Sequence, residues 1–269
     1  MMLKNFFKKK KVPKKFIFVV GSGRCGTYFF KELFKNNSLI ETYHERNNLL
    51  TSFYQFAKFN NFKVDYKYLI NSFKNIKIKK KIYFEASSYL SLNIFNISKS
   101  LNCKIVVLFR DPLKTCKSLQ AKGWYNETDL KNYSKKNNIG CHTESGIYFH
   151  HNFSRFLPVD NAYLKWINLP QIVKIKWFWN YIYKFLINEG KKLSKNKIRF
   201  INIDKFDYYK YLDLCNWFGC KPHLNSSDFK KISKFSLNTI KKKKLIIKKS
   251  ELKKFYNNYT FSEKKLFKI

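Results

Sequence analysis

The sequence of 269 residues has few small residues, with only four Ala, eight Gly and five Pro. It also lacks long apolar runs: Phe16 to Val20 and Ile105 to Phe109 are about five residues each, whereas a membrane-spanning helix requires about 20. The sequence therefore predicts no membrane span. No run of about 7–15 apolar residues follows the basic N-terminal extension, residues 1–14, as it would in a secretory signal. We therefore expect a cytoplasmic protein.

Cysteine is also sparse and carries no metal-binding pattern. None of the six cysteines forms a CxxC pair, and those with a histidine nearby do not reach the spacing of a four-ligand zinc site. We expect reduced, mostly buried thiols and no metal. The cysteines are Cys25, Cys103, Cys116, Cys141, Cys215 and Cys220.

Acidic residues are few, since 17 Asp and Glu face 55 Lys and Arg, for a formal charge of +38. One interpretation is drift in an AT-rich coding sequence, because Lys, Asn, Phe, Ile and Tyr are all frequent while only five of the basic residues are Arg. The other is a polyanionic partner. We favour the first and expect no specific nucleic acid, because the chain has no recognisable RNA-binding or helix-turn-helix signature.

Aromatic residues, by contrast, make up 19% of the chain, which excludes a disordered protein. Short apolar stretches alternate with helical patterns, and this alternation predicts a parallel sheet covered on both faces. We expect one α/β domain over residues 1–269, a three-layer α/β/α arrangement with a central parallel β-sheet. The predicted strands are Phe16 to Val20, Leu39 to Thr42, Ile82 to Glu85, Lys104 to Phe109 and Ile198 to Ile203. The predicted helices are Tyr28 to Lys35, Leu49 to Phe59, Tyr66 to Lys74, Leu92 to Leu101, Ile172 to Leu193, Tyr211 to Phe218 and Glu251 to Phe267.

A glycine-rich turn joins the first predicted strand to the first predicted helix. Three of the eight glycines fall within Gly21-Ser22-Gly23-Arg24-Cys25-Gly26, followed by Thr27 and Tyr28. Glycines let successive backbone amides point at one anion, and the following helix N-terminus adds partial positive charge. The Walker pattern GxxxxGK[ST] fails, because Thr27 stands where its Lys belongs and the cation is Arg24. The turn predicts a phosphate site that is not of the ordinary ATPase or GTPase type.

A second candidate element follows the strand Lys104 to Phe109. Arg110 ends that strand, Pro112 opens a helix, and Ser118 lies eight residues after the arginine. The carboxyl ends of strands are where open α/β sheets bind ligands. Arginine offers a planar fork suited to phosphate, and a serine adds a hydroxyl.

Together the two elements resemble the sulfotransferase family that uses the sulfate donor PAPS (3′-phosphoadenosine 5′-phosphosulfate). The loop resembles that family's 5′-phosphosulfate motif, and Arg110-Asp111-Pro112 with Ser118 resembles its 3′-phosphate motif. Weaker likenesses are Tyr43-His44-Glu45, Glu85-Ala86-Ser87-Ser88 and Asn202 to Phe206. The sequence departs from the family at Tyr28, Ala86 and Ser88.

This resemblance implies a fold of the P-loop nucleoside-phosphate-binding type and transfer of a sulfuryl group to a hydroxyl or amine acceptor, with a carbohydrate among the candidates. PAPS is then the co-substrate and PAP the product, and no metal takes part. The expected donor-site residues are Gly21, Ser22, Gly23, Arg24, Cys25, Gly26, Thr27, Tyr28, Arg110 and Ser118. Arg24 is also expected to act catalytically by neutralising charge on the leaving oxygen.

The acceptor needs a base, and the family uses His or Glu. We favour Glu45 and place His44 second; the alternative is that Glu45 only pairs with Arg46 or a lysine on the surface. The segment 123–170 shows little periodicity and is expected to form the acceptor-site loop, with His150 and His151 as weaker acceptor contacts.

Two further functions stay open at this stage: a P-loop kinase, which the missing Walker lysine disfavours, and a basic nucleic-acid-binding protein. The aromatic row on and just before the longest predicted helix is interpreted as core packing. Its members are Trp166, Trp177, Phe178, Trp179, Tyr181 and Tyr183. The sequence does not indicate the oligomeric state.

Overall fold

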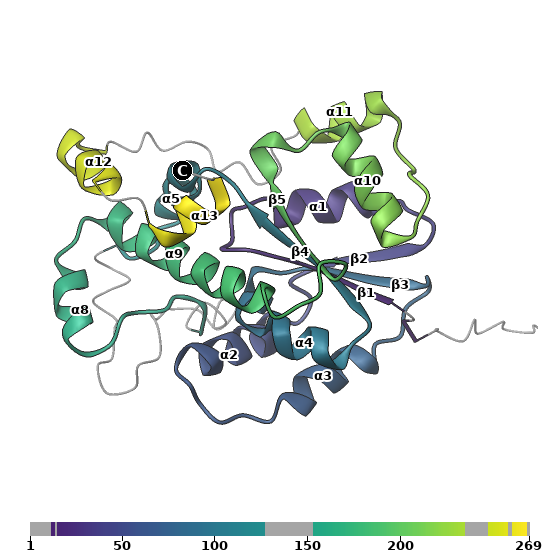
Figure 1. Ribbon diagram of the computed structural model, residues 1–269, viewed down its shortest axis with the longest axis horizontal. Coiled ribbons are helices and arrows are strands. Elements are labelled where there is room, and N and C mark those ends of the chain that lie inside the picture. The colour runs from purple at the N-terminus through teal and green to yellow at the C-terminus, as the bar shows by residue number, and fades with distance from the viewer. Residues whose placement is uncertain (1–11, 14, 127–152, 235–246, 258–259, 268–269) are drawn as a thin grey trace, which may run out of the picture.

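The protein is built on a five-stranded sheet in which every pair of neighbouring strands is parallel (Figure 1). The structure, a computed structural model, describes residues 12–13, 15–126, 153–234, 247–257 and 260–267. The strand order is β2-β3-β1-β4-β5, which confirms the predicted parallel sheet. The strands are β1 (Lys15–Val20), β2 (Ile40–His44), β3 (Ile82–Ala86), β4 (Cys103–Phe109) and β5 (Ile198–Asn202).

Alternate side chains of each central strand enter two separate hydrophobic cores. In β1, Phe16, Phe18 and Val20 pack into one core, whereas Ile17 and Val19 pack into the other. Side chains of a strand point alternately to its two faces, so a strand with a core on each side must be apolar throughout. This explains why the central strands read as continuous apolar runs.

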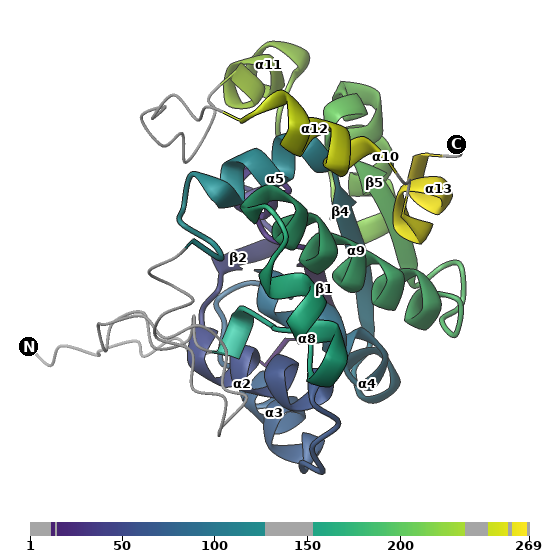
Figure 2. The ribbon, with the colours of Figure 1, turned by 90° about the vertical axis from the view of Figure 1, so that its left-hand side faces the viewer.

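Helices cover both faces, giving the predicted three layers (Figures 1 and 2). One face carries α1 (Thr27–Phe34), α10 (Tyr208–Phe218) and α11 (Ser226–Lys234). The other carries α2 (Asn48–Phe59), α3 (Tyr66–Lys74), α4 (Ile94–Ser100), α5 (Pro112–Gln120), α8 (Asp160–Ile167), α9 (Gln171–Gly190), α12 (Lys249–Tyr256) and α13 (Phe261–Phe267). Two short 3₁₀ helices, η1 (Ser88–Asn93) and η3 (Ile203–Lys205), follow β3 and β5.

The structure corrects the predicted elements at three places. Segment 123–170, expected to be a loop, contains helix α8. Trp166 of this helix packs into the core against Tyr125, with the ring centroids 5.0 Å apart. The helix predicted over Glu251 to Phe267 is two helices. The second, α13, has its own N-terminal cap: the Glu263 carboxylate accepts a hydrogen bond of 2.6 Å from the Thr260 amide, as at the start of a helix. Helix α11 was not predicted.

The aromatic row on α9 and its approach mostly packs inward, as expected. Trp166, Phe178, Trp179 and Tyr183 are all buried. Residues 127–152, with His150 and His151, and most of the extension 1–14 lie outside the described residues.

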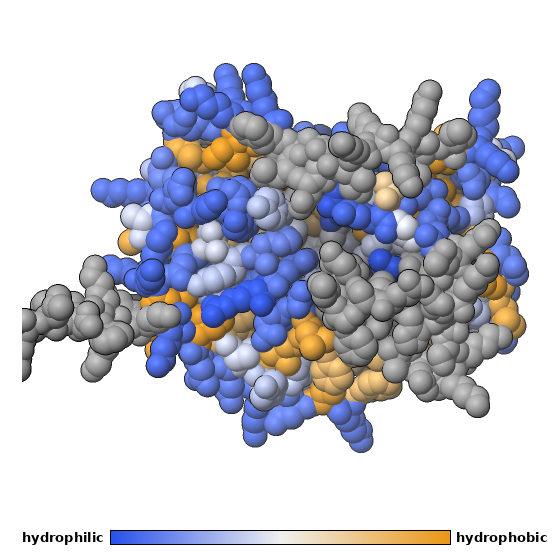
Figure 3. All heavy atoms as spheres, turned by 180° about the vertical axis from the view of Figure 1, so that it is seen from behind, coloured by the Kyte–Doolittle hydropathy of each residue, from blue (hydrophilic) through white to orange (hydrophobic). Residues whose placement is uncertain are grey.

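Hydrophilic side chains project from every side of the view in Figure 3, with apolar patches between them. Within the described residues, no helix has the length and apolar character that crossing a membrane requires.

A buried ion pair fastens the C-terminal helices to α9. Lys176 Nζ lies 3.1 Å from the Glu263 carboxylate and donates to the Phe255 carbonyl at 2.6 Å, and both charged side chains are buried. One lysine thus contacts both α12 and α13.

We expect Lys176→Met to lower the free energy of unfolding by about 3–5 kcal/mol, because it leaves the Glu263 carboxylate buried without its cation. Urea denaturation measures the change. Lys192→Met is the control, since its pair with Glu189 is exposed on the lysine side and contributes about 1 kcal/mol or less. Equal losses in the two variants would contradict this role for Lys176.

Candidate functional site

A cavity of about 390 Å³ opens at the carboxyl edge of the sheet, beside the ends of β1, β2 and β4. After β1 the chain enters α1 on one face, and after β4 it enters α5 on the other. The connections therefore diverge here, at the point where open α/β sheets bind their ligands. The lining residues are Ser22, Gly23, Arg24, Gly26, Thr27, Tyr28, Phe29, His44, Glu45, Gln55, Ser88, Tyr89, Arg110, Ser118, Leu119, Lys122, Trp124, Ser154, Arg155 and Phe178.

The glycine-rich loop is tightly curled against β4. A Cβ on Gly21 would lie 2.5 Å from Cys25 Sγ and 2.6 Å from the Leu108 carbonyl oxygen, so no side chain fits there. Gly26, at φ 101°, begins α1 in a conformation that L side chains rarely adopt. No side chain caps this helix start. The loop therefore presents the positive end of α1 to the cavity.

Long-range hydrogen bonds hold the loop from behind. The Gly21 amide donates to Ser91 Oγ at 3.1 Å, and that hydroxyl donates back to the Gly21 carbonyl at 2.8 Å. The Ser22 amide donates to Tyr183 Oη at 3.4 Å, while Tyr183 donates to the Leu108 carbonyl at 2.7 Å. The loop is thus tied to η1, α9 and β4 at once.

Two guanidinium groups and one hydroxyl meet on the same wall. Arg24 Nε donates to Ser118 Oγ at 2.9 Å, and Arg110 Nη1 donates to the Arg24 carbonyl at 3.4 Å. Burial, and secondarily the Arg110 charge, lowers the pKa of Arg24. Arg110 Nε is buried and has no hydrogen-bond partner among the described residues. Two adjacent cations on one cavity wall favour an anion of more than one charge.

The turn that carries Arg110 is held by η3, directly after β5. Asp204 accepts the Asp111 amide at 2.9 Å and the Lys114 ammonium at 3.0 Å. This gives the weakly matching segment Asn202 to Phe206 a definite structural role.

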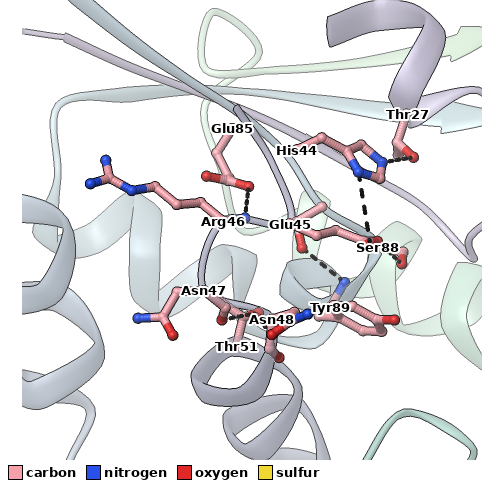
Figure 4. A network of polar contacts seen from close by, with 11 residues as sticks. Thr27, His44, Glu45, Arg46, Asn47, Asn48, Thr51, Glu85, Ser88 and Tyr89 are labelled. Carbon is pink, nitrogen blue, oxygen red and sulfur yellow. Dashed lines mark hydrogen bonds and ion pairs between the residues drawn. The ribbon is translucent and has the colours of Figure 1, made fainter. Parts of the chain in front are cut away.

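The opposite wall carries a carboxyl group and an imidazole (Figure 4). Ser88 Oγ donates to Glu45 Oε1 at 3.1 Å, and Glu45 Oε2 lies 4.0 Å from His44 Nδ1. Burial raises the pKa of Glu45 to about 7. Burial together with the Lys31 charge lowers the pKa of His44 to about 4, so the ring is neutral, and its Nε2 shares a hydrogen bond of 3.3 Å with Thr27 Oγ1.

Glu45 is not used in a surface ion pair. Among the described residues it forms no ion pair with a lysine or arginine, and the Arg46 guanidinium lies 4.6 Å over the Tyr43 ring. The carboxyl group faces the cavity instead.

The structure brings most of the predicted site residues together. Eight of the ten expected donor-site residues line the cavity, with His44 and Glu45. The other two, Gly21 and Cys25, belong to the loop but do not line the cavity. The Cys25 side chain is fully buried, which raises the pKa of its thiol to about 11.

Several residues of the cavity wall and of its support carry no signal in the sequence. The sequence places Tyr183 in the core, where it lies. It does not reveal the hydrogen bond between Tyr183 and the Ser22 amide, 161 residues away. Lys122, Trp124, Ser154 and Arg155 come from the ends of segment 123–170 or just before it, and no motif marks them. The only pointer to Trp124, Ser154 and Arg155 is the expectation that segment 123–170 lies at the acceptor site.

No family model and no curated protein matches this chain. Solved structures similar to it include a sulfotransferase domain from the curacin biosynthetic pathway, at 12% identity, 80% coverage of both chains and a TM-score of 0.44. A sulfotransferase domain of the Synechococcus PCC 7002 olefin synthase follows, at 11% identity, 80% and 79% coverage and a TM-score of 0.43. A third is retinol dehydratase in complex with androsterone and the inactive cofactor PAP, at 12% identity, 84% coverage of this chain, 65% of that chain and a TM-score of 0.36.

The buried carboxyl of Glu85, beside Glu45, predicts a measurable dependence of stability on pH. Burial raises the pKa of Glu85 to about 7 from 4.5, so the folded protein keeps a proton that the unfolded chain releases. The contribution of Glu85 to stability is therefore highest below pH 4.5 and falls as the pH rises to about 7.

Glu85→Gln removes this titration, so its free energy of unfolding, relative to the natural protein, should rise by on the order of 3 kcal/mol between pH 5 and pH 8. Denaturant unfolding at both pH values measures it. Groups that titrate alike in both proteins, such as His44, cancel in the difference, which reports Glu85 together with its coupling to Glu45. A difference independent of pH would show that Glu85 is ionised throughout.

Proposed function

We propose that this protein is a PAPS-dependent sulfotransferase that transfers a sulfuryl group to a hydroxyl or amine acceptor. The observation that carries the proposal is the convergence of Arg24, Arg110 and Ser118 on one wall of a cavity whose other wall holds Glu45. The chain positions of these groups span 94 residues, and only the parallel sheet edge brings them together.

The cationic wall suits the donor. The curled loop from Ser22 to Thr27 and the start of α1 would hold the 5′-phosphosulfate, with the Thr27 hydroxyl as an additional donor. Arg110 and Ser118 would bind the 3′-phosphate, the group that distinguishes PAPS from ATP. Arg24 lies between these two elements and contacts both Ser118 and Arg110.

The reaction needs positioning and charge stabilisation more than covalent help from the protein. The acceptor oxygen or nitrogen forms a bond to sulfur, and the bond from sulfur to the bridging oxygen breaks. The electron pair leaves with PAP, whose new oxygen charge Arg24 neutralises. The acceptor proton passes to the base.

Glu45 is better suited to be that base than His44. A general base works best when its pKa is close to the working pH. Burial raises the pKa of Glu45 to about 7, whereas the pKa of His44 is lowered to about 4, which makes the ring a weak base. His44 instead bonds to Thr27 and so links the two walls.

The acceptor would enter between Glu45 and the aromatic part of the cavity. Tyr28, Tyr89, Trp124 and Phe178 line it, together with the amide of Gln55. Aromatic faces beside polar groups suit a sugar ring as well as other hydroxyl compounds. A carbohydrate is therefore one candidate acceptor.

The donor site predicts tight binding of PAP that depends on Arg110. Arg110→Ala should weaken PAP binding by roughly 100-fold, the loss expected when charged hydrogen bonds to a phosphate are removed. ADP, which lacks the 3′-phosphate, should bind weakly to both proteins. Isothermal titration calorimetry at physiological salt measures the constants with nonspecific charge effects screened.

Arg199→Ala is the matched control, because Arg199 pairs with Asp213 and does not line the cavity. Equal, weak binding of PAP, ADP and ATP would reject the donor site. If all binding then fell steadily with salt, a general polyanion-binding protein would replace the proposal. Magnesium-dependent binding of ATP alone would favour a kinase.

The base assignment predicts a specific kinetic defect. Glu45→Gln should lower sulfuryl transfer at least about 100-fold, because the variant no longer accepts the acceptor proton, while PAP affinity stays unchanged. Transfer of labelled sulfate from PAPS to a panel of hydroxyl and amine compounds measures the rate, with Glu41→Gln as control. Transfer at the natural rate in Glu45→Gln would exclude Glu45 and direct attention to His44.

A further inference from the structure

Glu85 is a buried carboxyl group that the proposed reaction does not use. It lies in β3 with 2% of its surface exposed. Tyr83 donates its hydroxyl to Glu85 Oε2, and the Arg46 amide donates to Glu85 Oε1 at 3.1 Å. Burying a carboxyl group is costly, and a glutamine of the same shape would accept hydrogen bonds without that cost. The site thus retains an ionisable group where packing alone does not require one.

The Arg46 amide belongs to the turn that carries Glu45. Glu45 has a φ of 50°, a left-handed conformation that costs a residue with a Cβ about 1 kcal/mol or more. Two bonds from β3 hold the turn: the Glu45 amide donates to the Ala86 carbonyl at 3.2 Å, and the Arg46 amide donates to Glu85. Figure 4 shows Glu85 on one side of this turn and Ser88 on the other.

The charges facing the pair come from neighbouring elements. Tyr83 and Tyr43 enclose Glu85 from β3 and β2, with their rings stacked 5.2 Å apart, and Arg46 adds a positive charge that lowers the pKa of Glu85. Glu45 adds a negative charge that raises it. On the cavity side, His44 and Tyr89 face Glu45.

We propose that Glu85 is a positioning residue for Glu45: it anchors the turn that places Glu45 in the cavity and sets a second negative charge beside it. Its relevance to catalysis rests on the proposed function, since it acts through the base of that reaction. The anchoring and the charge are properties of the protein alone and are measured without donor or acceptor.

Glu85→Gln separates the two contributions. The amide oxygen still accepts the Arg46 amide, but the charge is gone. We expect the Glu45 titration midpoint, followed by carbon-13 NMR of its carboxyl group and assigned with Glu45→Gln, to fall by about one pH unit. Exchange of the Arg46 amide proton and the affinity for PAP should stay within about twofold of the natural protein.

Glu85→Met removes the acceptor as well, so the Arg46 amide should exchange at least about tenfold faster. Glu41→Gln is the matched control, because Glu41 also accepts the hydroxyl of a tyrosine two residues along its strand but lies at the other end of β2. Glu41→Gln should change neither the Glu45 titration midpoint nor the exchange rate of the Arg46 amide proton.

An unchanged Glu45 midpoint in Glu85→Gln, or unchanged Arg46 exchange in Glu85→Met, overturns the proposal. If Glu85→Met does not fold, the test is made on the natural protein. The NMR chemical shift of the Arg46 amide must then follow the titration of Glu85, and a chemical shift that does not change with pH rejects the anchor. PAP titration of the natural protein tests the donor site separately. A protein that fails to bind PAP but shows the coupled titration would refute the sulfotransferase and leave the pairing of Glu85 with Glu45 intact.

Discussion

The parallel register of β1 with its neighbours is the constraint on which the site depends. Val19 pairs with Ala86 of β3, and Val20 pairs with Val107 of β4, so three strands end at nearly the same level. The residues that follow must then share a small volume at one edge. Gly21 shows how tightly they do so, because a Cβ there would collide with Cys25 and with the Leu108 carbonyl. The close approach leaves the loop no freedom to turn elsewhere, and Ser91 and Tyr183 complete its support from two helices.

The strand order also sorts the charges of the cavity. Arg24 and Arg110 follow β1 and β4, whereas Glu45 follows β2 and Glu85 lies in β3. Because the order is β2-β3-β1-β4, the cations gather on one half of the edge and the carboxyl groups on the other. The proposed reaction requires opposite environments for a donor that carries several negative charges and for an acceptor that must lose a proton. The sheet supplies both by topology, and the contact between Thr27 and His44 lies where the two halves meet.

The sequence predicted the parts of this arrangement that depend on local pattern. Short apolar stretches located the five strands to within a residue or two, and the glycine spacing located the loop, because both signals lie within a few neighbouring residues. Helix α8 and the break before α13 were missed, since they depend on Trp166 packing against Tyr125 and on a cap at Glu263. For the same reason the sequence did not predict the parts played by Tyr183, Arg155 and Glu85. Their contacts join positions far apart in the chain, which one sequence without relatives does not reveal.

The distribution of basic residues bears on the high positive charge of the chain. Three of the five arginines, Arg24, Arg110 and Arg155, line the cavity, whereas among the lysines of the described ranges Lys122 alone does. Lysine supplies a strongly hydrated point charge, whereas arginine presents a planar fork of donors. That fork suits bidentate contact with a phosphate. The concentration of arginine at the cavity, within a chain whose other basic residues are mostly lysine, therefore supports the proposed anion site independently of the total charge.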